Sequence, residues 1–302
     1  MTNDIRNVEF DTTKLREQYF EYIDVSSRTR ETYNMALRQF FYYMQENNIS
    51  NPTRKDIIDF KENLITNGHS VSTVNTYLVA LRNFFEFLEY KDIYKNISKN
   101  IKNLKDTDIH KREALSSENC AKLIGVAKNL REQMLVKLAL VCGLRINAIV
   151  NIRLEDIKYE EEQYRIYILG KGRTTKQDYV IVPNDLMKEL LEYIKKYEIN
   201  DYLFVSTSKR NYGAKLTTGS IRRIVNSMLV RANLKKDTIV FHSLRHSFAT
   251  ISLENGMDIR EVSKALHHGS IVVTERYVHD MEMRNNKCSS NVFNAIKKAS
   301  EN

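Results

Sequence analysis

The sequence has few of the residues that interrupt helices or cross-link a chain. It contains two prolines, nine glycines, three cysteines and no tryptophan. Because proline and glycine disfavour the interior of helices, their scarcity favours a helix-rich protein. Cys120, Cys142 and Cys288 are far apart in the chain and form no CxxC pair, so we expect reduced thiols rather than a disulfide framework or a zinc site.

Long hydrophobic runs are absent as well. No apolar stretch approaches the roughly 18–20 residues needed to cross a bilayer. Residues 1–11 carry acids and lack the apolar segment of a secretion signal. We therefore expect a cytoplasmic protein with no membrane partner. Hydrophobic residues still make up 42% of the 302 positions, which is enough to bury the two cores expected for a chain of this length.

Positive charge is concentrated in one part of the chain. The net charge is +9, but residues 1–110 hold 15 Lys/Arg and 16 Asp/Glu, whereas residues 111–302 hold 32 and 22. Clustered lysines and arginines favour a polyanionic partner, because they displace the counterions condensed on nucleic acid. Many basic proteins bind no DNA, so the charge supports such a partner without establishing it.

Amphipathic helices dominate the first third of the sequence. Apolar residues recur there at three- and four-residue spacing, and Asn51-Pro52 and Asn67-Gly68 fall between the periodic segments. Four helices with short loops predict a small bundle, which we assign to an N-terminal domain at residues 10–96. The aromatic stripe of these helices is interpreted as core packing. The predicted helices cover residues 12–23, 27–45, 55–65 and 72–90.

Two of these helices begin with side chains suited to phosphate. Arg28 and Arg30 lie at the start of the second helix, and Ser72 and Thr73 lie at the start of the fourth. Helix N-termini and hydroxyl groups bind phosphate oxygens, which makes these four residues candidate DNA contacts. Ordinary helix capping explains the same residues, and the sequence does not separate the two interpretations.

The segment at residues 97–113 lacks apolar periodicity and is rich in lysine. We interpret it as a basic linker between two domains. It is either a solvated connector or a segment that lies across a DNA backbone.

The rest of the chain, residues 114–302, predicts a helical domain with one β-hairpin. β-branched and aromatic residues at 164–169 and 179–182 flank a glycine-containing turn at 170–175, and Gly143 is placed to end a strongly apolar helix. The fold class is therefore mainly α with a small β-hairpin sheet, an α+β protein. The predicted helices cover residues 116–128, 130–141, 146–153, 184–197, 218–232, 243–255, 259–266, a short segment around Tyr277, and about 290–299.

Six polar residues of this domain form an ordered series. The first follows the apolar helix, the second lies in the hairpin turn, and the third and fourth fall three apart on one helical face. The fifth precedes the sixth by nine residues. Each alone has an ordinary structural explanation in capping, turn formation or packing, but their order and spacing together indicate a site. In chain order they are Arg145, Lys171, His242, Arg245, His268 and Tyr277.

This series, with the run HSLRHSFAT at residues 242–250, resembles the tyrosine recombinase (phage integrase) family, particularly its compact Xer-type members. The resemblance covers residues 12–295 and is strongest at 140–157, 168–183 and 241–280. It implies an N-terminal SAM-like core-binding domain and a C-terminal catalytic domain that form a C-shaped clamp on DNA. It also implies that Arg145 and Arg245 are the family's arginine pair and that Tyr277 is its nucleophile.

The chemistry of the side chains fits the roles that the resemblance implies. Two guanidiniums can grip the nonbridging oxygens of a phosphodiester and stabilise the charge that develops there. Lys171 is the expected acid for the departing 5′-oxygen, and Arg173 beside it is a candidate DNA contact. His242 would accept the tyrosine proton or bond to the phosphate, and His268 would donate to the phosphate. Tyr277, with a reference pKa of about 10, would attack to give a 3′-phosphotyrosine and a free 5′-hydroxyl.

No cofactor and no metal are expected, because the arginines would do the work that metal ions do in two-metal nucleases. Two positions depart from the family pattern. His267 stands where the family usually has glycine, although the nine-residue interval favours His268 as the active histidine. Ala148 stands three residues after Arg145, where the family usually has an acid thought to orient the site. That departure puts the rate and the tuning of pKa values in doubt but leaves the nucleophile in place.

The resemblance also implies partners. We expect double-stranded DNA with two inverted half-sites, a dimer on each site and a homotetramer across two sites. The tail helix at about 290–299 would dock into a neighbouring protomer, with packing on its own domain as the alternative. A type IB topoisomerase-like enzyme and a non-catalytic DNA-binding accessory protein are the competing functions. Integration or excision of a mobile element and resolution of DNA through a Holliday junction fit the same chemistry.

Overall fold

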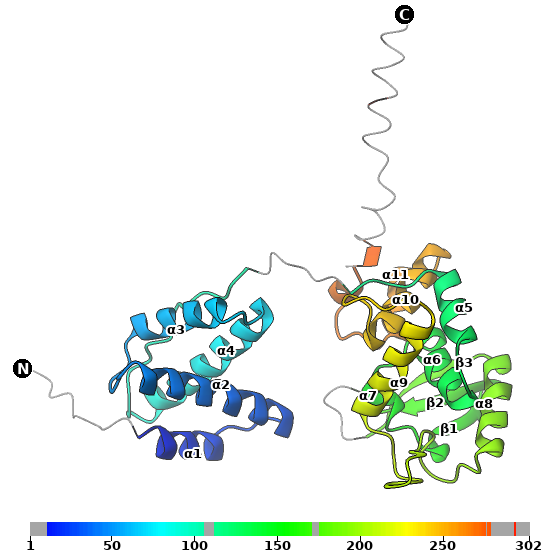
Figure 1. Cartoon of the computed structure of the whole chain (residues 1–302), viewed down its shortest axis with the longest axis horizontal. Coiled ribbons are helices and arrows are strands. Elements are labelled where there is room, and N and C mark those ends of the chain that lie inside the picture. The colour runs from blue at the N-terminus through cyan, green and yellow to red at the C-terminus, as the bar shows by residue number, and fades with distance from the viewer. Residues whose placement is uncertain (1–10, 106–111, 171–174, 276, 279–292, 294–302) are drawn as a thin grey trace, which may run out of the picture. The chain divides into compact units, whose positions relative to one another are not determined.

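The computed structural model describes residues 11–105, 112–170, 175–275, 277, 278 and 293. The chain divides between residues 109 and 110 into two compact units (Figure 1). Each unit is described by itself. The fold class is confirmed, since the described residues are mainly helical and contain one small sheet. None of their helices is both long enough and apolar enough to span a membrane.

The first unit is a four-helix bundle, as predicted, and the helix ends lie within one residue of the predicted ones. Serine side chains cap two of the helices: Ser26 accepts from the backbone N–H of Thr29, and Ser70 accepts from that of Thr73, each over 3.2 Å. Such caps satisfy N–H groups that have no partner inside the helix. The helices are α1 (Thr12–Tyr22), α2 (Ser27–Glu46), α3 (Arg54–Thr66) and α4 (Val71–Tyr90).

Aromatic side chains fill the core of this bundle, which confirms the interpretation of the aromatic stripe. The rings of Phe40 and Phe60 meet edge to face at 5.2 Å, and those of Tyr19 and Phe84 at 5.4 Å. Such pairs contribute about 0.5–1.5 kcal/mol beyond the burial of their area. The aromatic residues of α1, α2 and α3 therefore fix the packing of the bundle around α4.

The chain after α4 folds back onto the same bundle. Ile97 and Ile101 are each only 6% exposed and join its core. The Asn75 side chain holds both backbone groups of Leu104: it donates to the carbonyl over 3.0 Å and accepts from the N–H over 2.8 Å. Residues up to 104 thus belong to the first unit by their contacts, and residues 106–111 lie outside the described part of the chain. The predicted boundaries at 96–97 and 113–114 stay predictions.

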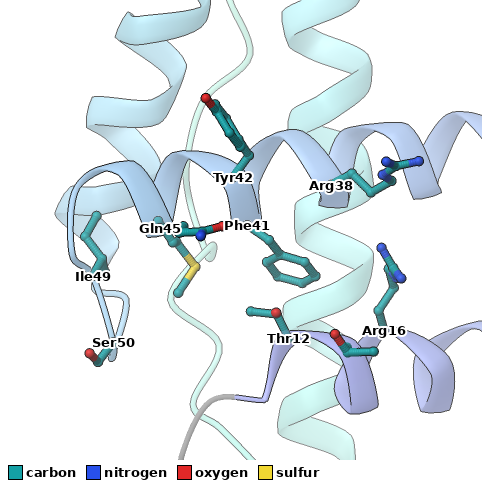
Figure 2. A pocket seen from close by; sticks show the side chains of 10 residues that line it. Thr12, Arg16, Arg38, Phe41, Tyr42, Gln45, Ile49 and Ser50 are labelled. Atoms are coloured by element: carbon teal, nitrogen blue, oxygen red, sulfur yellow. The ribbon is translucent and has the colours of Figure 1, made fainter.

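A hollow of about 520 Å³ opens between α1 and α2 in the first unit (Figure 2). Arg16 of α1 and Arg38 of α2 approach the same end of it, and Phe41 forms part of its floor. None of the predicted site residues lines this hollow.

The second unit contains helices packed against a three-stranded antiparallel sheet of order β1-β2-β3. The predicted hairpin is β2 and β3, in which Ile166 pairs with Val180. Strand β1 was not predicted, because its sequence IKYE alternates over only four positions, which is too short a run to be distinguished from a loop. The elements are α5 (Ser117–Gly125), α6 (Leu130–Val141), α7 (Ile146–Ile149), the 3-10 turn η1 (Leu154–Asp156), β1 (Ile157–Glu160), β2 (Gln163–Ile168), β3 (Asp178–Val182), α8 (Asn184–Lys196), α9 (Thr218–Arg231), α10 (Phe241–Glu254) and α11 (Ile259–Ala265).

The predicted helix at 146–153 is wrong beyond Ile149. The carbonyl of Asn151 accepts from the Lys176 ammonium over 2.9 Å, and that of Ile152 accepts from the N–H of Leu203 over 2.8 Å. The N–H groups of Asn151 and Ile152 bond three residues back, to Ala148 and Ile149, and Arg153 forms a bridge with Tyr202, so the α-helical pattern does not continue. The segment instead joins α7 to the sheet and to the loop after α8.

Helix α6 forms the centre of the second core, and a glycine at its end brings the next segment close to α10 and α11. Gly143 has a φ of +59°, and a Cβ added there would lie 2.8 Å from Leu266 and 2.9 Å from Phe248. Glycine is therefore required both by the backbone conformation and by the space. The close approach places Arg145, two residues on, beside α10.

Candidate active site

Arg245 is the most deeply buried charged residue of the predicted series. Its side chain points inward from α10, is 3% exposed, and donates to the carbonyl of Gly143 over 2.5 Å and to that of Leu266. Removal from water, together with the nearby charge of Arg145, lowers its pKa to about 9, so it still carries its proton at neutral pH. A buried cation of this kind binds an anion strongly, because little water screens the two charges.

Arg145 begins α7 and is half-buried. Desolvation lowers the pKa of Arg145, while the interaction with Tyr277 acts in the opposite direction. Tyr277 acts in the same way on Arg245. The charge of Arg145 also lowers the pKa of Arg245. Both guanidiniums therefore interact with one phenol, and a bound phosphate would relieve their repulsion.

His242 lies one turn before Arg245 on the same face of α10, as predicted. Although its side chain still reaches solvent, the surrounding protein removes part of its hydration. This desolvation, followed by the charges of Arg245, Arg145 and Arg112, lowers the pKa of His242 below its usual value. The imidazole is neutral at pH 7, which is the form that accepts a proton.

His268 is held by a buried hydroxyl. Its Nδ1 lies 2.8 Å from Oγ1 of Thr274, which is fully buried, so Nε2 would be the ring nitrogen available to a substrate. Desolvation, with contributions from Arg245 and Arg145, lowers the pKa of His268 to about 4. This histidine is also neutral at pH 7 and can donate to a phosphate oxygen when Nε2 carries the proton.

His267 faces a different part of the unit. Its Nε2 lies 3.0 Å from the carbonyl of Tyr179 on β3, and its backbone is left-handed, with a φ of +48°. Glycine adopts this conformation without strain, which accounts for the glycine that the family usually has there. The contact with β3 supports the prediction that His268, not His267, is the active histidine.

Tyr277 lies in a short helical segment after α11 and is only 7% exposed. It packs in a small apolar cluster with Ala249, Val262 and Leu266. The ring of His246 meets it at 5.2 Å and 68°. The phenol is therefore held against α10 and α11 of its own unit.

The structure thus brings five of the six predicted residues close enough together to interact electrostatically. Lys171 and Arg173 lie outside the described residues. Ala148, at the position of the family's acid, is 7% exposed, so a methyl group occupies this buried position. The five residues are Arg145, His242, Arg245, His268 and Tyr277.

The candidate DNA contacts of the first unit lie at exposed helix starts, as predicted. Arg28 forms a 3.2 Å ion pair with Glu31, and Arg30 lies over the ring of Phe20 at 5.4 Å. Ser72 is exposed, and the hydroxyl of Thr73 lies 2.9 Å from that of Ser70. These contacts are local and leave the DNA-binding role a prediction.

Sequence reasoning missed two features near the site. His246 touches both His242 and Tyr277, and the four-residue spacing from His242 was an available signal. Lys176, which follows the hairpin turn, forms an ion pair with Asp156, whose side chain is 8% exposed. This pair ties the chain just before β3 to η1.

Comparison with known proteins places this geometry in a family. The phage integrase family matches residues 113–284, and the phage integrase N-terminal SAM-like domain matches residues 17–91. Tyrosine recombinase XerA of Pyrococcus horikoshii is 27% identical over 273 residues, which cover 89% of this chain and 90% of the relative. Tyrosine recombinase XerD of Oceanobacillus iheyensis is 27% identical over 290 residues, which cover 89% and 94%.

Solved structures show the same fold. XerH bound to a palindromic difH substrate, in a post-cleavage complex, has a TM-score of 0.74 and 23% identity, covering 92% of this chain and 84% of that one. A lambda integrase (75–356) dimer bound to a COC′ core site has a TM-score of 0.71 and 15% identity, covering 86% and 96%.

A SAM-like bundle followed by this catalytic unit defines an enzyme that transfers DNA strands. The chain belongs to the phage integrase family. It is a tyrosine recombinase, and its reaction is site-specific DNA recombination. The predicted family, enzyme class and function are confirmed over the topoisomerase-like and non-catalytic alternatives.

Proposed function

We propose that Tyr277 is the nucleophile of this recombinase and that Arg145 and Arg245 hold the scissile phosphate. The observation that carries the proposal is the placement of Arg245, which is almost fully buried and bonds to the carbonyl of Leu266, the residue against which Tyr277 packs. Tyr277 also interacts electrostatically with both guanidiniums. Cations fixed in a dry site stabilise the charge of a phosphoryl-transfer transition state without having to reorganise. His268 donates a further hydrogen bond to the phosphate.

Each proton has an assigned place in the reaction. The phenolic oxygen of Tyr277 bonds to phosphorus while the bond from phosphorus to the 5′-oxygen breaks. The phenolic proton passes to neutral His242. Lys171, assigned by its place in the hairpin, gives its proton to the departing 5′-oxygen. The products are a 3′-phosphotyrosine and a 5′-hydroxyl, and the reverse reaction with a different 5′-hydroxyl exchanges strands.

A nicked suicide substrate tests the nucleophile, because the short cleaved strand diffuses away and the covalent adduct accumulates. Tyr277→Phe should form no adduct and should bind the same DNA with unchanged affinity. Tyr212→Phe is the matched control, since Tyr212 lies in the same unit and is 79% exposed. An adduct formed by Tyr277→Phe at the wild-type rate would refute the assignment.

The proposed partner is double-stranded DNA with two inverted half-sites, bound by two protomers per site and by a homotetramer across two sites. The structure of XerH with a palindromic difH substrate and that of a lambda integrase tetramer on a Holliday junction support this assembly by analogy. Arg28, Arg30, Ser72 and Thr73 would contact DNA from the first unit, with Arg173 from the second. We place the reaction in the cytoplasm, where it would integrate, excise or resolve DNA, including mobile elements.

The tail at 290–299 is proposed to link neighbouring protomers. Phe293, the described residue of this tail, is 67% exposed, which suits a side chain that docks elsewhere. Removal of residues 290–302 should abolish strand exchange between two sites and preserve binding to a single site. Normal recombination by the shortened protein would exclude the docking role.

A further inference from the structure

His246 occupies a position between two groups of the proposed reaction. Its ring meets that of His242 at 4.7 Å and 89°, and it meets that of Tyr277 at 5.2 Å and 68°. Both contacts are edge to face. One imidazole thus touches the proposed nucleophile and the proposed proton acceptor together.

The helical geometry of α10 explains this placement. His246 lies one turn after His242 and three residues before Ala249, so all three side chains share a face. Ala249 is fully buried and packs in the same cluster as Tyr277. The phenol therefore rests on a small aliphatic side chain and against the ring of His246.

The buried neighbours of Tyr277 in the cluster are aliphatic: Ala249, Val262 and Leu266 bury the ring without preferring one orientation of its plane. Phe248 and Leu253 pack against the same cluster. An aromatic neighbour prefers an edge-to-face arrangement, because the positive edge of one ring meets the negative face of the other. The edge-to-face contact with His246 therefore favours one plane of the phenol, and with it one direction of the hydroxyl.

We propose that His246 is a positioning residue for Tyr277: its ring fixes the plane of the phenol and so directs the attacking oxygen at the phosphate held by Arg145 and Arg245. The ring of His246 also packs against the ring of His242. This inference rests on the proposed role of Tyr277. Misplacement of a reacting group by about 1 Å can cost roughly a hundred-fold in rate, so a lost restraint of this kind is measurable.

Two substitutions at His246 distinguish the contribution of the ring from that of its nitrogen atoms. His246→Ala removes the ring and should slow single-turnover formation of the covalent adduct on the nicked substrate by roughly ten- to hundred-fold, with unchanged DNA affinity. His246→Phe keeps a ring of similar shape and should restore most of the rate. Thermal unfolding of both variants verifies that they are folded.

A half-reaction that does not use Tyr277 serves as the second measurement. A DNA strand ending in a 3′-(p-nitrophenyl phosphate) is joined to a strand with a 5′-hydroxyl: the 5′-oxygen bonds to phosphorus, its proton passes to the solvent, and p-nitrophenolate leaves. This leaving group needs no proton, and the phosphate is still activated by the arginines. Both proteins carry Tyr277→Phe in this measurement, so that the phenol cannot attack the phosphate. The rate of joining with His246→Ala added should stay close to that of Tyr277→Phe alone.

Three results would overturn the proposal. They are an unchanged rate of adduct formation in His246→Ala, an equal loss of both reactions, and a failure of His246→Phe to restore the rate. An equal loss would mean that the substitution damages the phosphate site, and a failure of Phe would mean that an imidazole nitrogen is needed. An adduct formed by Tyr277→Phe would instead refute the nucleophile, so the two failures are distinguishable.

Discussion

The guanidinium of Arg245 donates a hydrogen bond to the backbone carbonyl of Gly143, 2.5 Å away, and so ties α10 to the turn that carries Arg145. A second bond from the same side chain goes to the carbonyl of Leu266, just before His268. One side chain therefore joins three segments of the site, and its planar fork is what allows this.

Arg245→Lys should weaken both the fold and the reaction. Lysine keeps the charge but replaces the fork with one ammonium, so at least one buried carbonyl loses its donor. We expect the free energy of unfolding to fall by about 1–3 kcal/mol, together with a large loss of adduct formation. Chemical denaturation and the suicide substrate measure the two effects. Arg222→Lys, at an exposed position of α9, is the control, and equal behaviour of the two variants would contradict this role.

Gly143→Ala should destabilise the catalytic unit. The left-handed backbone at +59° costs a residue with a Cβ about 1–2 kcal/mol, and contacts of 2.8 and 2.9 Å to Leu266 and Phe248 add overpacking. The same change at Gly125, where the added methyl group would meet nothing within 4 Å, should be nearly neutral. Unfolding curves for both variants test the difference. Wild-type stability in Gly143→Ala would show that the turn can relax.

The stability of the protein should fall between about pH 6.5 and pH 4 because of His268. Its pKa is about 4 in the folded protein and about 6.5 in an unfolded chain, so protons bind preferentially to the unfolded state in this window. The contribution of this histidine is complete above about pH 6.5 and is lost as the pH falls towards 4. The lowered pKa of His242 acts in the same direction.

Comparison of the wild-type protein with His268→Gln isolates this effect from the titration of carboxylates. Glutamine does not titrate, so its curve of unfolding free energy against pH should be flatter over the same window. Parallel curves for the two proteins would show that His268 titrates in the folded state as it does in water.

Lys171→Ala should be defective only when the leaving group needs a proton. We expect a large loss of adduct formation on ordinary DNA, because an alkoxide is a poor leaving group. A substrate with sulfur in place of the bridging 5′-oxygen should restore most of the rate, since a thiolate leaves without a proton. Arg173→Ala is the control and should show no such restoration. If sulfur fails to rescue Lys171→Ala, another group is the acid.

Local signals predicted most of the fold. Residues 130–141 were predicted as a helix with the bounds observed for α6, because the segment is strongly apolar and is followed by Gly143, a residue suited to end a helix. The predictions failed where distant contacts decide the structure. Helix α7 ends early, and the chain after it pairs with a distant segment: Arg153 forms a bridge with Tyr202, and the Ile152 carbonyl accepts from Leu203. Nothing in the local sequence reveals those partners.

The prediction of the site likewise succeeded where the signal is local and failed where distant segments meet. Order and spacing identified His242 and Arg245, which share one face of one helix. The contact of His246 with Tyr277 depends on how two segments 31 positions apart pack together, and the spacing along α10 indicates only half of it. Likewise, the support that Asp156 gives to Lys176 requires the fold of the sheet.

Tyr277 packs against Ala249, Val262 and Leu266 of its own chain. This packing has a consequence for which subunit cuts which strand. With the roles proposed for Tyr277, Arg145 and Arg245, the phenol would attack the strand gripped by its own molecule, and no subunit would borrow its neighbour's tyrosine. Mixed assemblies of one variant lacking the phenol and another lacking a guanidinium would then contain no complete centre at all.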